Sequence, residues 1–142
     1  MRQSLSEKTT TSTGRGAAVG AVVLSLALAV AGIIDQAGGQ SLVDHTAAVY
    51  ASYGKQPASG LLYGLVYTVA VVNVLLWLLV ARWPKAALAV TSVVITAALA
   101  VVLLTTSEYG AHLFPALWGV LALLPAVAGI AATVMVVRRS GR

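Results

Sequence analysis

Side chains capable of metal or proton chemistry are few in this sequence, and the clearest candidates lie between its apolar runs. His45 follows Asp44, and His112 comes four residues after Glu108. Imidazole and carboxylate groups bind metal ions, and imidazole binds haem iron, so with Asp35 these residues are candidate ligands of one site. The alternative interpretation is that they are solvated loop residues, because their spacing matches no established motif. We favour the alternative and predict no metal, no cofactor and no catalytic residue.

Asn73 is the most polar side chain inside an apolar run. It shares one helical stripe with Tyr67 and Trp77. An amide is costly in lipid without a partner, so Asn73 should face another helix. One hypothesis is a ligand contact in a central cavity lined by these three side chains. The other, which we favour, is an interhelical hydrogen bond. The candidate partners are the hydroxyl residues of other runs: Ser25, Thr91, Thr96 and Thr133.

Proline and glycine add two features of helix shape and packing. Pro125 lies inside the last apolar run, where it removes one backbone hydrogen bond, so we predict a helix kink there. Small residues recur four positions apart, as Gly16 with Gly20, Gly60 with Gly64 and Gly129 with Thr133. Such pairs let helices approach closely, and we expect this within one chain, with a homodimer as the alternative.

Several kinds of chemistry are missing from the sequence. Its 142 residues include no cysteine, which excludes disulfides, thiol redox chemistry and thiolate metal sites. No phosphate-binding glycine loop, nucleophile elbow or H-E-x-x-H motif is present. The apolar runs hold no ionisable acid, base or histidine, whereas proton-coupled transporters need one at membrane depth. These absences favour a non-enzymatic protein.

Composition places the chain in a bilayer. Only 9% of its residues are charged and 59% are hydrophobic, whereas soluble domains carry about 25% charged residues. A soluble fold would therefore expose large apolar patches. The net charge of +5 does not indicate nucleic acid, because the basic residues flank the apolar runs and form no stripe with aromatic residues.

Four apolar runs are long enough to cross the membrane, which needs about 20 residues. Because lipid offers no hydrogen bonds, each run should be α-helical. We therefore predict an all-α, four-helix transmembrane bundle. The predicted spans are residues 16–34, 60–81, 86–105 and 115–137.

The basic residues predict the orientation, because Lys and Arg accumulate on the cytoplasmic side. Of the nine, only Lys55 falls on the outer side, so both termini are expected in the cytoplasm of a plasma-membrane protein. The inner eight are Arg2, Lys8, Arg15, Arg82, Lys85, Arg138, Arg139 and Arg142. In an alternative, residues 1–31 form a signal peptide cleaved after an A-x-A site, leaving three spans in the same orientation.

The polar segments complete the prediction. We expect residues 1–15 to be a disordered cytoplasmic tail and residues 138–142 a basic one. The outer loops are 35–59 and 106–114. In the first, Leu42, Thr46, Val49, Tyr50 and Tyr53 recur at helical spacing. This spacing indicates a short helix along the interface, and an irregular loop is the alternative.

Two sets of residues resemble a known group of proteins. The first is Tyr50-Ala51-x-Tyr53-Gly54 with Leu62-Tyr63, and the second is Phe114-Pro115-x-Leu117-Trp118-Gly119 with Leu124-Pro125 and Ala128-Gly129. Together they are similar to small four-pass membrane proteins of actinobacteria. The resemblance implies topology and no activity.

Three functional hypotheses follow from these features. The leading one is a non-enzymatic accessory or interaction protein of the plasma membrane, whose partners are lipid and another membrane protein or a second copy. The second is a small carrier or sensor for a lipid or apolar compound, with a cavity around Asn73. The third is the outer metal or haem site using His45 and His112.

Overall fold

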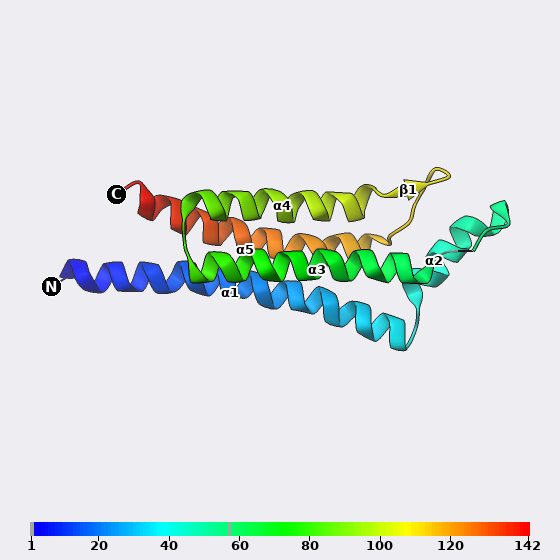
Figure 1. The fold of residues 1–142 in the computed structure, drawn as a ribbon, viewed down its shortest axis with the longest axis horizontal. Coiled ribbons are helices and arrows are strands. Elements are labelled where there is room, and N and C mark those ends of the chain that lie inside the picture. Colours follow the sequence, from blue (N-terminus) through cyan, green and yellow to red (C-terminus); the bar gives the residue numbers. More distant parts are fainter. Residues whose placement is uncertain (1, 57) are drawn as a thin grey trace.

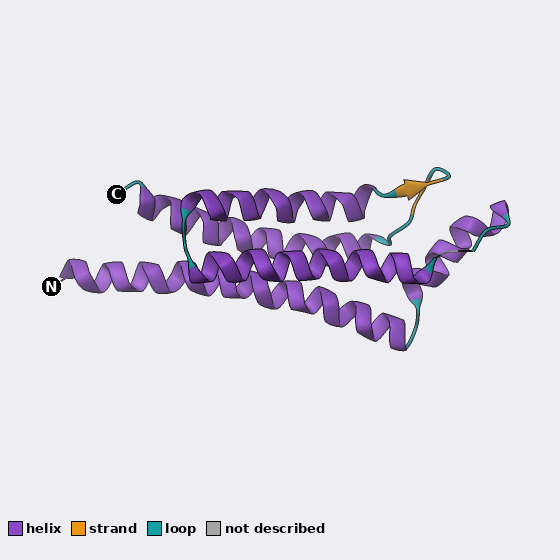
Figure 2. Cartoon of the chain, viewed as in Figure 1, coloured by secondary structure: helices purple, strands orange, loops and turns teal. Residues whose placement is uncertain are grey.

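The computed structural model describes residues 2–56 and 58–142, with side chains from Gly14 onwards. The described residues form five α-helices, one 3-10 turn and one short β-hairpin (Figure 2). In chain order the elements are α1 (Arg2–Ala37), α2 (Ser41–Tyr50), η1 (Ala51–Tyr53), α3 (Ser59–Arg82), α4 (Ala86–Thr105), β1 (Ser107–Glu108), β2 (Ala111–His112) and α5 (Ala116–Ser140). Four of the helices, α1, α3, α4 and α5, are long and apolar enough to cross a membrane.

Each of the four predicted runs lies within one long helix, except that Pro115 of the fourth run precedes α5. The shortest, α4, has 20 residues, about 30 Å at 1.5 Å per residue, which matches the hydrocarbon core of a bilayer. The prediction of a disordered tail over residues 1–15 is wrong for the described part, because α1 begins at Arg2. Once the apolar run has formed a helix, adding residues to its end needs no new nucleus. The basic tail is also shorter than expected, since α5 continues to Ser140.

The long helices lie side by side in one bundle (Figure 1). α1 packs against α3 and α5, and α4 packs against α5 and, over a smaller surface, against α3. Both chain termini and the α3–α4 connection lie at one end, which we call the terminal end. The opposite end carries α2, η1 and the hairpin, and we call it the loop end. The tight connection around Pro84 makes α3 and α4 antiparallel neighbours.

The core contains two apolar clusters separated by polar side chains. The loop-end cluster includes Leu28, Leu62, Tyr63, Val66, Leu103, Phe114 and Trp118. The terminal-end cluster includes Ala18, Val22, Trp77, Val80, Ala89 and Val136. Between them, on α1, α3 and α4, lie four fully buried polar residues that we call the central polar layer: Ser25, Asn73, Ser92 and Thr96.

The short helix expected in the first outer loop is confirmed as α2. Leu42 and Thr46 occupy successive turns of its inner face, and both are fully buried. The Thr46 hydroxyl lies 2.8 Å from the carbonyl of Leu42 and 3.2 Å from that of Leu113, just before α5. α2 is therefore fixed to the loop end of the bundle.

Candidate functional site

The amide of Asn73 is buried without a partner. Its side chain is fully inaccessible, and neither its nitrogen nor its oxygen has a hydrogen-bond partner among the described residues. The hydroxyl of Ser92, in the same layer, also lacks one. The predicted interhelical bond of Asn73 is therefore wrong. The expected partners are otherwise engaged or exposed: Ser25 and Thr133 donate to backbone carbonyls, Thr96 accepts from Trp77, and Thr91 is exposed.

Trp77 joins three helices instead of lining a cavity with Asn73. Its ring is fully buried, and Nε1 donates a hydrogen bond to Oγ1 of Thr96 over 3.1 Å. The ring lies against Gly129 of α5, where an added β-carbon would be 2.2 Å from Cζ2 of the indole. Glycine is therefore required at position 129 for this packing.

Tyr67 reaches the loop end of α1. Its hydroxyl donates to Oε1 of Gln36 over 2.7 Å, and the hydroxyl of the neighbouring Tyr63 donates to Oδ2 of Asp35 over 2.8 Å. Tyr67 and Trp77 thus point to different partners at different depths. The structure does not bring the three cavity candidates together.

Asp35 caps the start of α2, although it lies six residues before Ser41 in the sequence. Its carboxylate accepts hydrogen bonds from the backbone N–H groups of Ser41 and Leu42, at 2.9 and 3.1 Å, and from the hydroxyls of Ser41 and Tyr63. Gln40, the residue before α2, has left-handed backbone and provides no side-chain cap. A carboxylate at a helix start satisfies free N–H groups and faces the positive end of the helix dipole. The role of Asp35 is therefore structural.

A strained turn places Tyr109 at the tip of the loop end. Tyr109 and Gly110 have φ values of 53° and 78°, as in a type I′ hairpin turn. A non-glycine residue rarely adopts this conformation, and surrounding contacts must hold it. The Tyr109 ring stacks on Tyr53 with centroids 4.0 Å apart, and Nζ of Lys55 donates to its hydroxyl over 2.6 Å.

Tyr50 connects the same turn to α2. Its hydroxyl donates to the carboxylate of Glu108, and its ring meets that of Tyr109 edge-on, with centroids 5.8 Å apart. The bond to Glu108 raises the pKa of Tyr50, and the bond to Tyr109 raises the pKa of Lys55. We call Tyr50, Tyr53 and Tyr109 the tyrosine cluster. Sequence reasoning missed it, because Tyr109 is 56 residues from Tyr53 and no pattern links the two.

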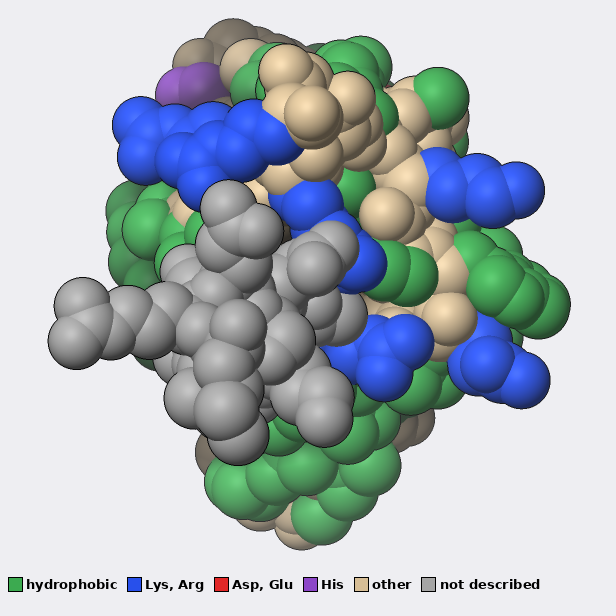
Figure 3. All heavy atoms as spheres, turned by 90° about the vertical axis from the view of Figure 1, so that its left-hand side faces the viewer, with side chains coloured by type: hydrophobic (Ala, Val, Ile, Leu, Met, Phe, Trp, Pro, Cys, Tyr) green, Lys and Arg blue, Asp and Glu red, His purple; other side chains and the backbone are tan. Residues whose placement is uncertain are grey.

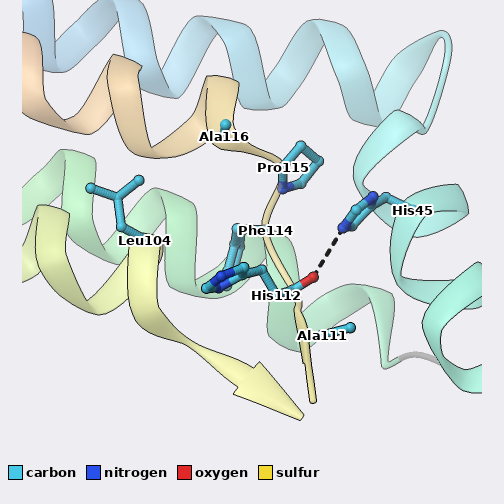
Figure 4. Close-up of a pocket in the computed structure, with 7 residues that line it drawn as sticks. All are labelled: His45, Leu104, Ala111, His112, Phe114, Pro115 and Ala116. Carbon is cyan, nitrogen blue, oxygen red and sulfur yellow. Dashed lines mark hydrogen bonds between the residues drawn. The ribbon is translucent and has the colours of Figure 1, made fainter. Parts of the chain in front are cut away.

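The two histidines border one hollow but do not form a ligand pair. Nε2 of His45 donates to the backbone carbonyl of His112 over 3.0 Å, and the His112 ring lies toward Phe114, away from His45 (Figure 4). The carboxylate of Glu108 is bonded to Tyr50, and Asp44 is exposed. Among the described residues, no group of three His, Asp or Glu side chains comes together that could hold a metal ion. The hollow, about 530 Å³, is lined by His45, Leu104, Ala111, His112, Phe114, Pro115 and Ala116.

The Gly16–Gly20 and Gly60–Gly64 pairs border open space. An added β-carbon at any of these four glycines would meet no atom of the described residues within 4 Å. The close helix contacts use other glycines: Gly32 against Tyr67, Gly119 against Leu104 and Gly129 against Trp77. The expectation of packing within the chain is therefore met by Gly129 of the Gly129–Thr133 pair, but not by the Gly16–Gly20 and Gly60–Gly64 pairs among the described residues.

Pro125 is buried within a continuous α5. It has no N–H to donate to the carbonyl of Leu121, four residues earlier. α5 is assigned as one helix on both sides of it, and the kink stays a prediction.

No family model, curated protein or solved structure matches the chain. The resemblance to four-pass actinobacterial proteins therefore stays a prediction.

Proposed function

We propose that this chain is a multi-pass plasma-membrane protein, with both termini in the cytoplasm, that acts as a non-enzymatic accessory or interaction partner of another membrane protein or a second copy. The observation that carries the proposal is the open space beside Gly16, Gly20, Gly60 and Gly64 among the described residues. Small residues four apart on a lipid-facing helix allow a second helix to approach closely. These glycines contribute no close contact inside the chain, so such an approach is available to a partner.

The interaction surfaces can be tested without disturbing the bundle. Gly20→Ile and Gly64→Ile add side chains in open space, so both variants should fold. We expect each to reduce self-association in detergent, or recovery of a membrane partner, by tenfold or more. Val23→Ile, at another exposed position of α1, is the matched control. If both glycine variants associate like the control, these faces contact lipid only.

The orientation rests on charge and on the position of the chain ends. Eight of the nine Lys and Arg residues belong to the segments expected inside, and the termini share one end of the bundle. The absence of cysteine makes single-cysteine labelling direct. A membrane-impermeant maleimide should label Ser107→Cys in intact cells and Ser140→Cys only after lysis. The reverse pattern would exclude cytoplasmic termini.

A carrier or sensor for a lipid or apolar compound is the second candidate, and the unpartnered amide of Asn73 favours it. The two pockets described lie at the loop end and do not include this residue, so a carrier must open to reach it. Reaction of Asn73→Cys with a small membrane-permeant thiol reagent in the native bundle tests this opening. A completely unreactive thiol would exclude the carrier.

A further inference from the structure

The terminal end of the bundle carries a group of basic side chains from all four long helices or their connections. We call it the basic belt. Its members are Arg15, Arg82, Lys85, Arg138, Arg139 and Arg142, all of them exposed. Figure 3 views this end and shows Lys and Arg on several sides of it, with no acidic side chain in view.

Helix contacts bring the belt residues to one level. Gly14 of α1 lies against α5, where its added β-carbon would be 3.7 Å from Cβ of Met135. The hydroxyl of Thr133 in α5 lies 3.2 Å from the carbonyl of Ala89 in α4. Arg15 follows Gly14 by one residue, Arg138 follows Met135 by three, and Lys85 precedes Ala89 by four, so the three lie at a similar level of the bundle. The belt is thus a property of the fold, although its members are up to 127 residues apart.

The belt has no counter-charge among the described side chains. Asp35, Asp44 and Glu108, the three acids described, all lie at the loop end. The charges there are mostly engaged within the chain: Asp35 caps α2, Glu108 binds Tyr50, and Lys55 binds Tyr109. At the terminal end, the guanidinium of Arg82 lies 5.7 Å from the centre of the Trp83 ring. The exposed belt cations can therefore attract an anionic partner from outside the described part of the chain.

The position of the belt identifies that partner. Each cation lies within a few residues of one end of a candidate span, which is the depth of lipid headgroups. Trp83, 52% exposed beside Arg82, is of the residue type enriched at this depth. Basic groups at helix ends attract anionic lipids of the facing leaflet. We propose that the basic belt binds the headgroups of anionic phospholipids and so selects the lipids around the bundle.

Native mass spectrometry of the full chain in non-ionic detergent tests the proposal. Phosphatidylglycerol should bind more tightly than phosphatidylcholine with the same acyl chains, and added salt should weaken this preference. Replacing two belt cations, as in Arg82→Gln with Lys85→Gln, should lower affinity for phosphatidylglycerol about 30-fold. Lys55→Gln, which removes the cation of the loop end, should leave the affinity unchanged. Equal binding of the two lipids would overturn the proposal.

Two further measurements separate charge from folding and lipid from soluble anions. Arg138→Lys with Arg139→Lys keeps both charges and should retain affinity within about threefold, whereas the corresponding glutamine pair should lose about 30-fold. Equal loss in both pairs would assign these residues a structural role and contradict lipid selection. Deca-glutamate peptide or inorganic phosphate should not displace phosphatidylglycerol. Displacement by either would make the belt a site for a soluble anion and overturn the proposal.

Discussion

Replacing Asn73 by leucine should stabilise the protein. The side chain is fully buried, and both of its polar atoms lack partners among the described residues. Leucine has the same branching, so its two methyl groups would occupy the positions of the amide oxygen and nitrogen. The variant removes a desolvation cost and no described contact.

The size of the effect follows from that cost. A buried polar group without a hydrogen bond costs about 1–3 kcal/mol. The slightly larger methyl groups offset part of this gain by crowding their neighbours. We therefore expect Asn73→Leu to raise the free energy of unfolding by roughly 1–2 kcal/mol. Titration from mild detergent into dodecyl sulfate, followed by far-ultraviolet circular dichroism, measures the change.

A second variant in the central polar layer should have the opposite effect on the free energy of unfolding. Thr96→Val keeps the shape of the side chain but removes the acceptor for the buried N–H of Trp77. It should lower the free energy of unfolding by about 1–3 kcal/mol. If Thr96→Val behaves this way but Asn73→Leu also destabilises by more than about 1 kcal/mol, then Asn73 has a partner after all. That result would refute the reasoning and favour the carrier.

Three other predictions concern helix packing, the α2 cap and the tyrosine cluster. Gly129→Ala should lower the free energy of unfolding by about 1–3 kcal/mol, because its methyl group would lie 2.2 Å from an indole carbon; Gly20→Ala, in open space, should not lower it in the same titration. Asp35→Asn should weaken the cap of α2 by about 0.5–2 kcal/mol, seen as faster amide exchange in α2 but not in α3; unchanged exchange would contradict this role. The hydrogen bond to Glu108 raises the pKa of Tyr50 above the ordinary tyrosine value of 10.0. The stabilisation that this hydrogen bond gives the folded protein is therefore complete below pH 10.0 and is lost as the pH rises through the raised pKa. Tyrosinate absorbance should therefore show a late-titrating group that is missing in Tyr50→Phe.

The spans were predictable because lipid imposes length and apolarity together. The third run, residues 86–105, coincides with α4, and residues 60–81 differ from α3 by one residue at each end. The error lies at the N-terminus, where polar residues continue α1 to Arg2. The composition of a segment indicates whether it can cross a membrane. It does not indicate whether the membrane-spanning helix continues into the polar residues that flank the segment.

Partners of individual polar groups were harder to predict, because they depend on rotation and depth that the sequence leaves open. Asn73 was expected to find a hydroxyl, and four lie on other helices, yet Trp77, one turn away, takes Thr96. An indole can reach a facing helix from a position where the shorter amide cannot. The tyrosine cluster was equally hidden, since it depends on how α2 and the hairpin fold over the same end.

The contacts of the glycines were also hard to predict from the sequence, and they support the functional proposal. Spacing marked Gly16 with Gly20 and Gly129 with Thr133 alike as packing motifs, but among these glycines it is Gly129 that makes a close contact with an aromatic ring. The large side chain opposite requires the internal glycine, but no neighbour within the chain requires the outer pair. Lipid alone does not require glycine, which is a poorer helix former than alanine by about 1 kcal/mol. The outer pairs leave room for a second helix to approach closely, which the proposed interaction with another membrane protein or a second copy would use.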